Sequence, residues 1–283
     1  MTELPEIHKF GGSCLRDASD VERIAEILEL AQKPVIVVVS ALWGTTDRLM
    51  RAAQEPRYAG RLVNDLASHH LRFSPTLIDS SLYDVFQKVL EGIEDSLTAL
   101  ATDRNDRSAY NRLLASGERL SALVIAHALS IRGLPAHPVG AEDIGVHLDG
   151  AGRASRVDLD KSRAKLDRSA FHGVPVVTGW FGEGTDGDIA LLGRGGSDHT
   201  ATALAAADLG AGEAERLAQK FTQEHARTRI AERVICAVHR DGEGGRRHLL
   251  GRLPKEERLR LRRQGLGFSH RYTGVYEANL RAN

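Results

Sequence analysis

The sequence predicts a three-layer α/β/α sandwich with a mostly parallel central sheet. Short β-branched runs alternate with segments of helical periodicity, and glycine-rich turns stand where the expected strands end. Continuous apolar runs of about four to eight residues are typical of strands buried on both faces. Strands that alternate with helices in this way indicate an α/β fold.

The strongest strand signal is residues 34–40, a proline and five β-branched residues followed by a serine. A helix is expected just before it, at 20–28, because apolar side chains recur there at helical spacing. The same patterns predict strands at 174–178 and 189–192, helices at 58–72, 84–101 and 200–209, and a helix through Leu120, Leu123, Val124 and Leu129.

Composition excludes several classes of protein. The chain has 283 residues, of which 42% are hydrophobic and 27% charged, and its formal net charge is zero. This length allows one large domain or two small ones with a real core. Cys14 and Cys236 are too few for a disulfide scaffold, the opening residues do not resemble a signal peptide, and no apolar run suggests a membrane span. We therefore expect a cytoplasmic protein without membrane association.

The neutral total hides an asymmetry along the chain. Residues 211–283 contain 16 Lys or Arg against 9 Asp or Glu, a net charge of +7, so residues 1–210 carry −7. A Gly-Ala break at 210–212 coincides with this shift in composition. The sequence thus predicts a main domain at 1–210 and an arginine-rich tail at 211–283.

The first candidate site is the segment Lys9-Phe10-Gly11-Gly12-Ser13. Two glycines after a strand allow the backbone to approach a ligand closely, so that backbone N–H groups can cradle phosphate oxygens. Lys9 adds a compact positive charge for the same phosphates. The spacing matches neither a Walker A loop nor GxGxxG, which indicates a nucleotide site of another design. The alternative is a tight turn beside a surface lysine.

The second candidate is residues 40–47, directly after the valine-rich strand. Ligands of open α/β sheets bind at the carboxyl ends of strands, where the hydroxyl groups of Ser40 and Thr46 are expected. Either hydroxyl could bind a phosphate or a substrate carboxylate. Alternatively, Thr45, Thr46 or Asp47 only caps the following helix.

The third candidate is the segment Ser116-Gly117-Glu118, interpreted as the opening of an apolar helix. Gly117 leaves room for a ligand, and the carboxylate of Glu118 suits the ammonium group of a substrate. A carboxylate in the first turn of a helix can also serve only to complement the helix dipole.

The fourth candidate is the loop from Gly193 to Thr200, in which three glycines surround Arg194. A flexible loop that opens onto a helix is an anion site, because it offers amide donors and the positive end of the helix dipole. The guanidinium of Arg194 matches a carboxylate or a phosphate. Ser197 is also a plausible N-cap.

Taken in order, five segments resemble the catalytic domain of aspartate kinases, in the amino acid kinase family. They are Lys-Phe-Gly-Gly-Ser at 9–13, Val-Ser-Ala then Gly-Thr-Thr-Asp at 39–47, Ser-Gly-Glu-Arg-Leu-Ser-Ala at 116–122, Val-Thr-Gly-Trp-Phe-Gly at 177–182 and Leu-Gly-Arg-Gly-Gly-Ser-Asp-His-Thr-Ala-Thr at 192–202. The resemblance covers about residues 5–210. It implies transfer of the ATP γ-phosphoryl group to the side-chain carboxylate of L-aspartate, with Mg²⁺ bridging the nucleotide phosphates.

The resemblance also implies a role for each matching residue. Catalytic roles fall to Lys9, which neutralises the transferring phosphate, and to Asp198. ATP phosphates are assigned to Lys9, Gly11, Gly12, Ser13, Gly195 and Gly196. Aspartate is assigned to Ser40, Thr46, Glu118, Arg194, Ser197 and Asp198. No residue is assigned as a metal ligand, and the expected partners are L-aspartate, ATP and further copies of the chain, with no nucleic acid.

The resemblance ends after residue 210, where the family continues with an acidic loop for adenine and ribose. An arginine-rich run stands there instead, so the nucleotide half of the domain is expected to be incomplete. Three interpretations remain open for residues 211–283: a diverged or frame-shifted tail, an interaction tail for phosphate polymers or acidic partners, or a solvated helix. A catalytically defective binding protein is therefore the alternative to an active kinase.

Overall fold

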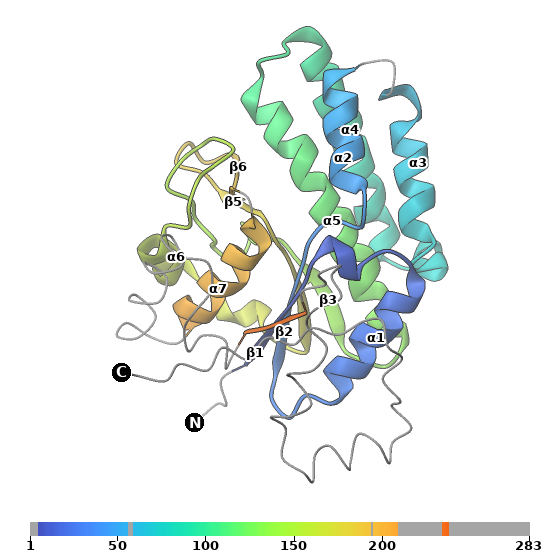
Figure 1. Ribbon diagram of the computed structural model, residues 1–283, viewed down its shortest axis with the longest axis vertical. Helices are drawn as coiled ribbons and strands as arrows, with labels where there is room; N and C mark the ends of the chain where they lie inside the picture. The colour runs from blue at the N-terminus through green and yellow to red at the C-terminus, as the bar shows by residue number, and fades with distance from the viewer. Residues whose placement is uncertain (1–4, 56–58, 194, 209–233, 238–283) are drawn as a thin grey trace, which may run out of the picture.

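A five-stranded parallel sheet forms the centre of the protein in this computed structural model, which describes residues 5–55, 59–193, 195–208 and 234–237. The strand order is β3-β4-β2-β1-β7, and every neighbouring pair is parallel. The strands are β1 Glu6–Phe10, β2 Val35–Val39, β3 Ala136–Val139, β4 Val174–Thr178 and β7 Val234–Ala237. Figure 1 shows the sheet between two groups of helices.

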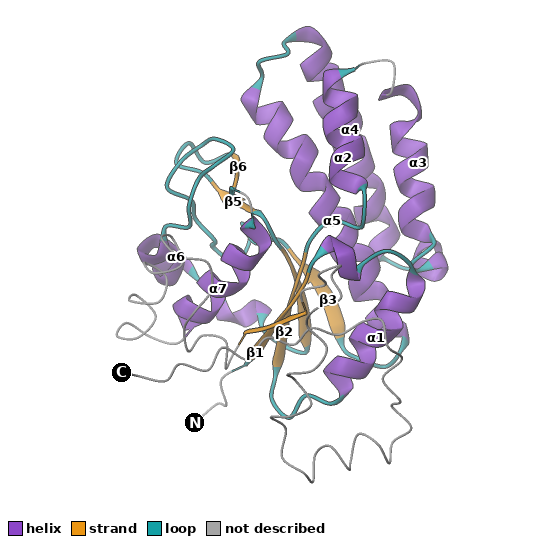
Figure 2. Ribbon diagram, viewed as in Figure 1, coloured by secondary structure: helices purple, strands orange, loops and turns teal. Residues whose placement is uncertain are grey.

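Helices cover both faces of the sheet, which confirms the predicted three-layer sandwich (Figure 2). On one face, Val37 and Val39 of β2 pack in a core with α1 (Ala18–Glu29) and α5 (Arg107–Ile131). On the other face, Ile36 and Val38 pack with α7 (Gly196–Asp208), beside α6 (Leu159–Lys165). The β-branched run is thus buried on both sides, as its composition predicts.

Three further helices lie outside α5 or beside it, and they extend the first layer away from the sheet (Figure 1). They are α2 Thr45–Gln54, α3 Ala59–Leu71 and α4 Leu82–Thr102, with short 3₁₀ turns at Gly12–Cys14, Pro75–Asp79 and Arg168–Ala170. Apart from α5, the predicted helices and strands lie within a few residues of the observed bounds. The strand predicted at 189–192 is β6 (Ile189–Leu191), which pairs antiparallel with β5 (Phe181–Glu183) in a separate small sheet.

Helix α5 is longer than predicted and begins much earlier. It starts at Arg107, where the side chain of Asp106 accepts a hydrogen bond from the backbone N–H of Ala109. Glu118 therefore lies in the middle of the helix, and the interpretation that it complements the helix dipole in a first turn is wrong. By length and hydropathy α5 could cross a membrane, but 83% of its apolar window is buried inside the fold, as in a core helix.

Strand β7 lies beyond the composition boundary near residue 210. Its residues Val234 to Ala237 pair in parallel with β1, and Cys236 stands opposite Lys9. The boundary thus falls between α7 and β7 along the chain. The division into domains at 1–210 and 211–283 stays a prediction, and most of the arginine-rich segment lies outside the described residues.

Candidate functional site

The site lies at the carboxyl edge of the sheet, where β1, β2 and β4 end side by side. The backbone N–H of Ser40 donates to the carbonyl oxygen of Phe10 at 3.1 Å, and the N–H of Gly179 donates to that of Val39 at 2.9 Å. These two bonds join the loops that follow the three strands. The carboxyl edge is where open α/β sheets bind ligands.

Lys9 is buried at this edge and is not the surface lysine of the alternative interpretation. Only 8% of the residue is exposed, and its Nζ lies 2.8 Å from Oδ1 of Asp198 in the first turn of α7. The Asp198 side chain is 40% exposed, so the ion pair is open to solvent on one side. A buried ammonium with an accessible counter-ion can bind an incoming anion.

Two glycines follow β1, and their lack of side chains leaves room beside the ammonium group of Lys9 and the loop after β2. A Cβ on Gly11 would lie 3.2 Å from Nζ of Lys9, and a Cβ on Gly12 would lie 3.0 Å from the carbonyl oxygen of Ala41. Side chains at these positions would compete with the lysine or press on the loop after β2. Ser13 continues the segment inside the 3₁₀ turn and is half-buried.

The loop after β2 meets the beginning of α7 through two hydroxyl groups. Oγ of Ser40 donates a hydrogen bond to Oγ of Ser197 at 2.9 Å. Helix α7 begins at Gly196, and Gly195 before it has φ of 77°, which favours glycine. Ser197 is therefore inside the first turn, and the prediction that it is the N-cap is wrong.

Glu118 reaches the same loop from α5. Its Oε1 accepts a hydrogen bond from the backbone N–H of Ala41 at 3.2 Å, while its Oε2 is buried without a partner among the described residues. Burial raises the pKa of Glu118 from 4.5 to about 8, partly offset by backbone hydrogen bonds from Ala41 and from its own amide. No cation pairs with this buried carboxyl group among the described residues, so the group could accept one from a ligand.

The predicted capping of α2 is not observed. Gly44, in the left-handed conformation, occupies the N-cap position, and no side chain caps the helix. Thr45 is fully buried, and its Cγ2 lies 3.3 Å from the position of a Cβ on Gly117. Thr46 is half-buried in the first turn of α2, and no hydrogen bond joins it to the other site residues within the described ranges.

The turn after β4 also belongs to the site, although sequence reasoning gave it no role. A Cβ on Gly179 would collide with Ser197, and a Cβ on Gly196 would collide with the ring of Trp180. Trp180 has φ of 70°, an uncommon conformation for a bulky residue, and its indole N–H donates to the carbonyl oxygen of Leu192 at 2.8 Å. Such strain at a strand end is typical of functional sites.

The structure thus brings together residues from segments far apart in the chain. Contacts join Lys9 to Asp198, Ser40 to Ser197 and Glu118 to the loop after Ser40. Arg194 lies outside the described residues. Among the residues that are described, no group of three His, Cys, Asp or Glu side chains gathers in a way that could hold a metal ion.

The sequence profile of the amino acid kinase family matches residues 6–216, which make up most of the chain. The chain belongs to the amino acid kinase family. Among curated proteins, it is 38% identical over 166 residues to an aspartokinase of Thermus thermophilus, covering 56% of this chain and 40% of that protein. It is 31% identical over 218 residues to the bifunctional aspartokinase/homoserine dehydrogenase 2 of Escherichia coli K12, covering 71% of this chain and 26% of that protein.

Solved structures show the same fold. The structure of E. coli aspartokinase III in complex with aspartate and ADP matches with a TM-score of 0.63 and 24% identity, covering 72% of this chain and 47% of that one. The chain therefore spans less than half the length of these relatives. The amino acid kinase-like fold and the resemblance to aspartate kinase catalytic domains are confirmed.

Proposed function

We propose that this chain carries the phosphoryl-transfer site of an aspartate kinase. The supporting observation is the buried Lys9 near the end of β1, which forms an ion pair with Asp198 beside the Ser40–Ser197 hydrogen bond. The reaction moves the γ-phosphoryl group of ATP to the side-chain carboxylate of L-aspartate. The bond between the β–γ bridging oxygen and the γ-phosphorus breaks, a bond from phosphorus to the carboxylate oxygen forms, and ADP leaves with the electron pair.

This chemistry requires positioning and charge neutralisation more than proton transfer. The acceptor is already a carboxylate at neutral pH, so no general base is needed, but it must approach an anionic phosphate. Lys9 reduces that repulsion, because its ammonium is fixed at the strand end with little solvent around it. The narrow space at Gly11 and Gly12 allows phosphate oxygens to approach the backbone there.

The acceptor would be held by other groups at the same edge of the sheet. Glu118 is suited to the substrate ammonium, since that cation would supply the charge its buried carboxyl group lacks. Ser40, Thr46, Ser197 and Arg194 are assigned to aspartate by the family resemblance. Mg²⁺ would enter with ATP and supply positive charge between the phosphates, held mainly by the nucleotide.

An ATP- and aspartate-dependent hydroxamate assay tests this function. We expect acyl phosphate formation by the full chain, with a loss of about a hundredfold or more in kcat for Lys9→Ala and parental activity for the exposed Lys33→Ala. Equal activity of both variants would refute the role of Lys9. An inactive parent that still binds aspartate would support the alternative, a catalytically defective binding protein.

A further inference from the structure

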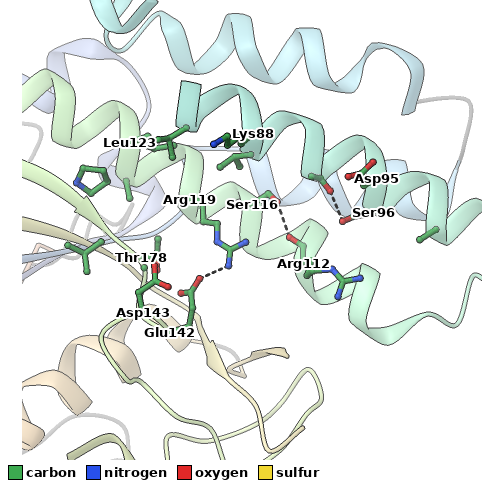
Figure 3. Close-up of a pocket in the computed structure, with 18 residues that line it drawn as sticks. Lys88, Asp95, Ser96, Arg112, Ser116, Arg119, Leu123, Glu142, Asp143 and Thr178 are labelled. Atoms are coloured by element: carbon green, nitrogen blue, oxygen red, sulfur yellow. Dashed lines mark hydrogen bonds and ion pairs between the residues drawn. The ribbon is translucent and has the colours of Figure 1, made fainter. Parts of the chain in front are cut away.

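A cavity of about 790 Å³ lies between α4, α5 and the carboxyl end of β3, and the function proposed above leaves it unexplained (Figure 3). We call it the α4–α5 pocket. Its lining includes Gly92 and Asp95 of α4, Arg119 and Leu123 of α5, and Glu142 in the loop after β3. The pocket borders the candidate site at Ser116 and Thr178, but its lining does not include Lys9, Ser40, Glu118, Ser197 or Asp198. Its volume suits a small organic molecule.

Two carboxylates face each other closely on the loop after β3. A Cβ on Gly140 would lie 2.9 Å from Oε2 of Glu142 and would collide with Oδ2 of Asp143, so both oxygens lie close to one point. Glycine at 140 leaves room for the two side chains to fold back over the end of β3. Like charges held this close favour a cation between them.

Positive charge from the protein reaches only part of this acidic pair. Arg119 forms an ion pair with Oε1 of Glu142, and its guanidinium also lies over the ring of Phe181, 5.2 Å from the centroid. Oε2 of Glu142 is buried without a hydrogen-bond partner, and Asp143 has no ion pair, among the described residues. Figure 3 places Lys88 beside Leu123, away from both acids. The unmatched charge at this end of the pocket is negative.

The rest of the pocket offers an apolar wall. Val89, Ala122, Leu123 and Val139 line it together with Gly92, in the interior of α4. Glycine inside a helix destabilises it relative to alanine. A Cβ on Gly92 would meet no atom within 4 Å, so no close neighbour requires glycine there and the missing side chain leaves the pocket open.

We propose that the α4–α5 pocket binds a small organic ammonium ion with an apolar body, its cationic group between Glu142 and Asp143. The apolar body packs on α4 and α5 over Gly92 and Leu123. An amine and the zwitterion of an apolar amino acid share this chemistry. They differ in a carboxylate, which the amino acid carries on the same carbon as its ammonium group.

Calorimetry or NMR titration on the full chain tests this directly, with isopentylammonium as the probe. We expect it to bind at least about tenfold more tightly than 3-methylbutan-1-ol and 3-methylbutanoate, which match its shape without the positive charge. Leucine compared with isopentylammonium then separates the two sources: tighter binding of leucine indicates an amino acid and weaker binding an amine.

Three substitutions locate the binding. Asp143→Asn should weaken binding of isopentylammonium about tenfold. Gly92→Leu should abolish binding by filling the open space, since a Cβ at this position meets no atom within 4 Å. Gly60→Leu is the matched control, because Gly60 is a helical glycine with equally open space that does not line the pocket. Absence of binding, equal binding of the three probes, or binding unaffected by Gly92→Leu would overturn the proposal. Each outcome is independent of kinase activity.

Discussion

Replacement of Glu118 by glutamine tests the electrostatic reasoning about the candidate site. Glutamine has the shape of a protonated glutamate, so it can still accept the hydrogen bond from the Ala41 N–H. Burial raises the pKa of Glu118 from 4.5 to about 8, which means that the folded protein favours the neutral carboxyl group. Its contribution to stability is therefore fully present below the unfolded pKa and is lost as the pH rises through the folded one.

The magnitude follows from proton linkage. Between the two pKa values, one proton is released on unfolding, so the free energy of unfolding falls by roughly 1.4 kcal/mol per pH unit because of this group. Between about pH 5.5 and 7.5 the stability of the parent should thus fall by roughly 2–3 kcal/mol relative to Glu118→Gln. The difference between the two proteins isolates Glu118, because buried histidines such as His70 titrate in both.

Urea unfolding at a series of pH values, followed by tryptophan fluorescence, measures this difference. Parallel stability curves for the parent and Glu118→Gln across this pH range would refute the claim that the buried carboxyl group is neutral in the folded protein. A second readout concerns the substrate. Since an ammonium group favours the charged carboxylate, aspartate binding near pH 7 should release close to one proton from the parent and none from Glu118→Gln.

Two further predictions concern glycines whose surroundings differ. Gly12→Ala should lower kcat about tenfold or more with a small loss of stability. The reason is that the new Cβ would lie only 3.0 Å from the carbonyl oxygen of Ala41. Unchanged kinetics in the hydroxamate assay would contradict this. Gly92→Ala should raise the free energy of unfolding by about 0.5–1 kcal/mol, since it adds a good helix former in open space, and a destabilised variant in urea titrations would count against it.

The central fold is predictable because β2 has an unambiguous sequence. Five consecutive β-branched residues suit a strand that is buried on both faces, and Val35 to Val39 are at most 6% exposed. Strand β3 was not predicted, because it is a short edge strand with half-buried residues and contains Pro138. The start of α5 was missed because its N-cap, Asp106, lies well before the Ser-Gly-Glu motif.

The candidate site is less predictable from local patterns. Lys9 and Asp198 are distant along the chain, and their ion pair depends on how β1 and α7 pack across the sheet. The positions of the candidate segments along the sequence indicate only that each one follows a strand or opens a helix. That these segments form one site was therefore predicted from the family resemblance. The place of Trp180 in the site could not be predicted, because it depends on a left-handed backbone conformation that the sequence does not reveal.

Helix α5 connects the two regions of the protein to which we assign binding. Because side chains leave a helix about 100° apart, adjacent residues point to different neighbours: Glu118 bonds the loop after β2, while Arg119 bonds Glu142 in the α4–α5 pocket. A Cβ on Gly117 would lie 3.1 Å from the Cβ of Ala41, so α5 packs closely on the loop after β2 beside the candidate site. The two proposed binding regions thus meet at adjacent residues of one helix.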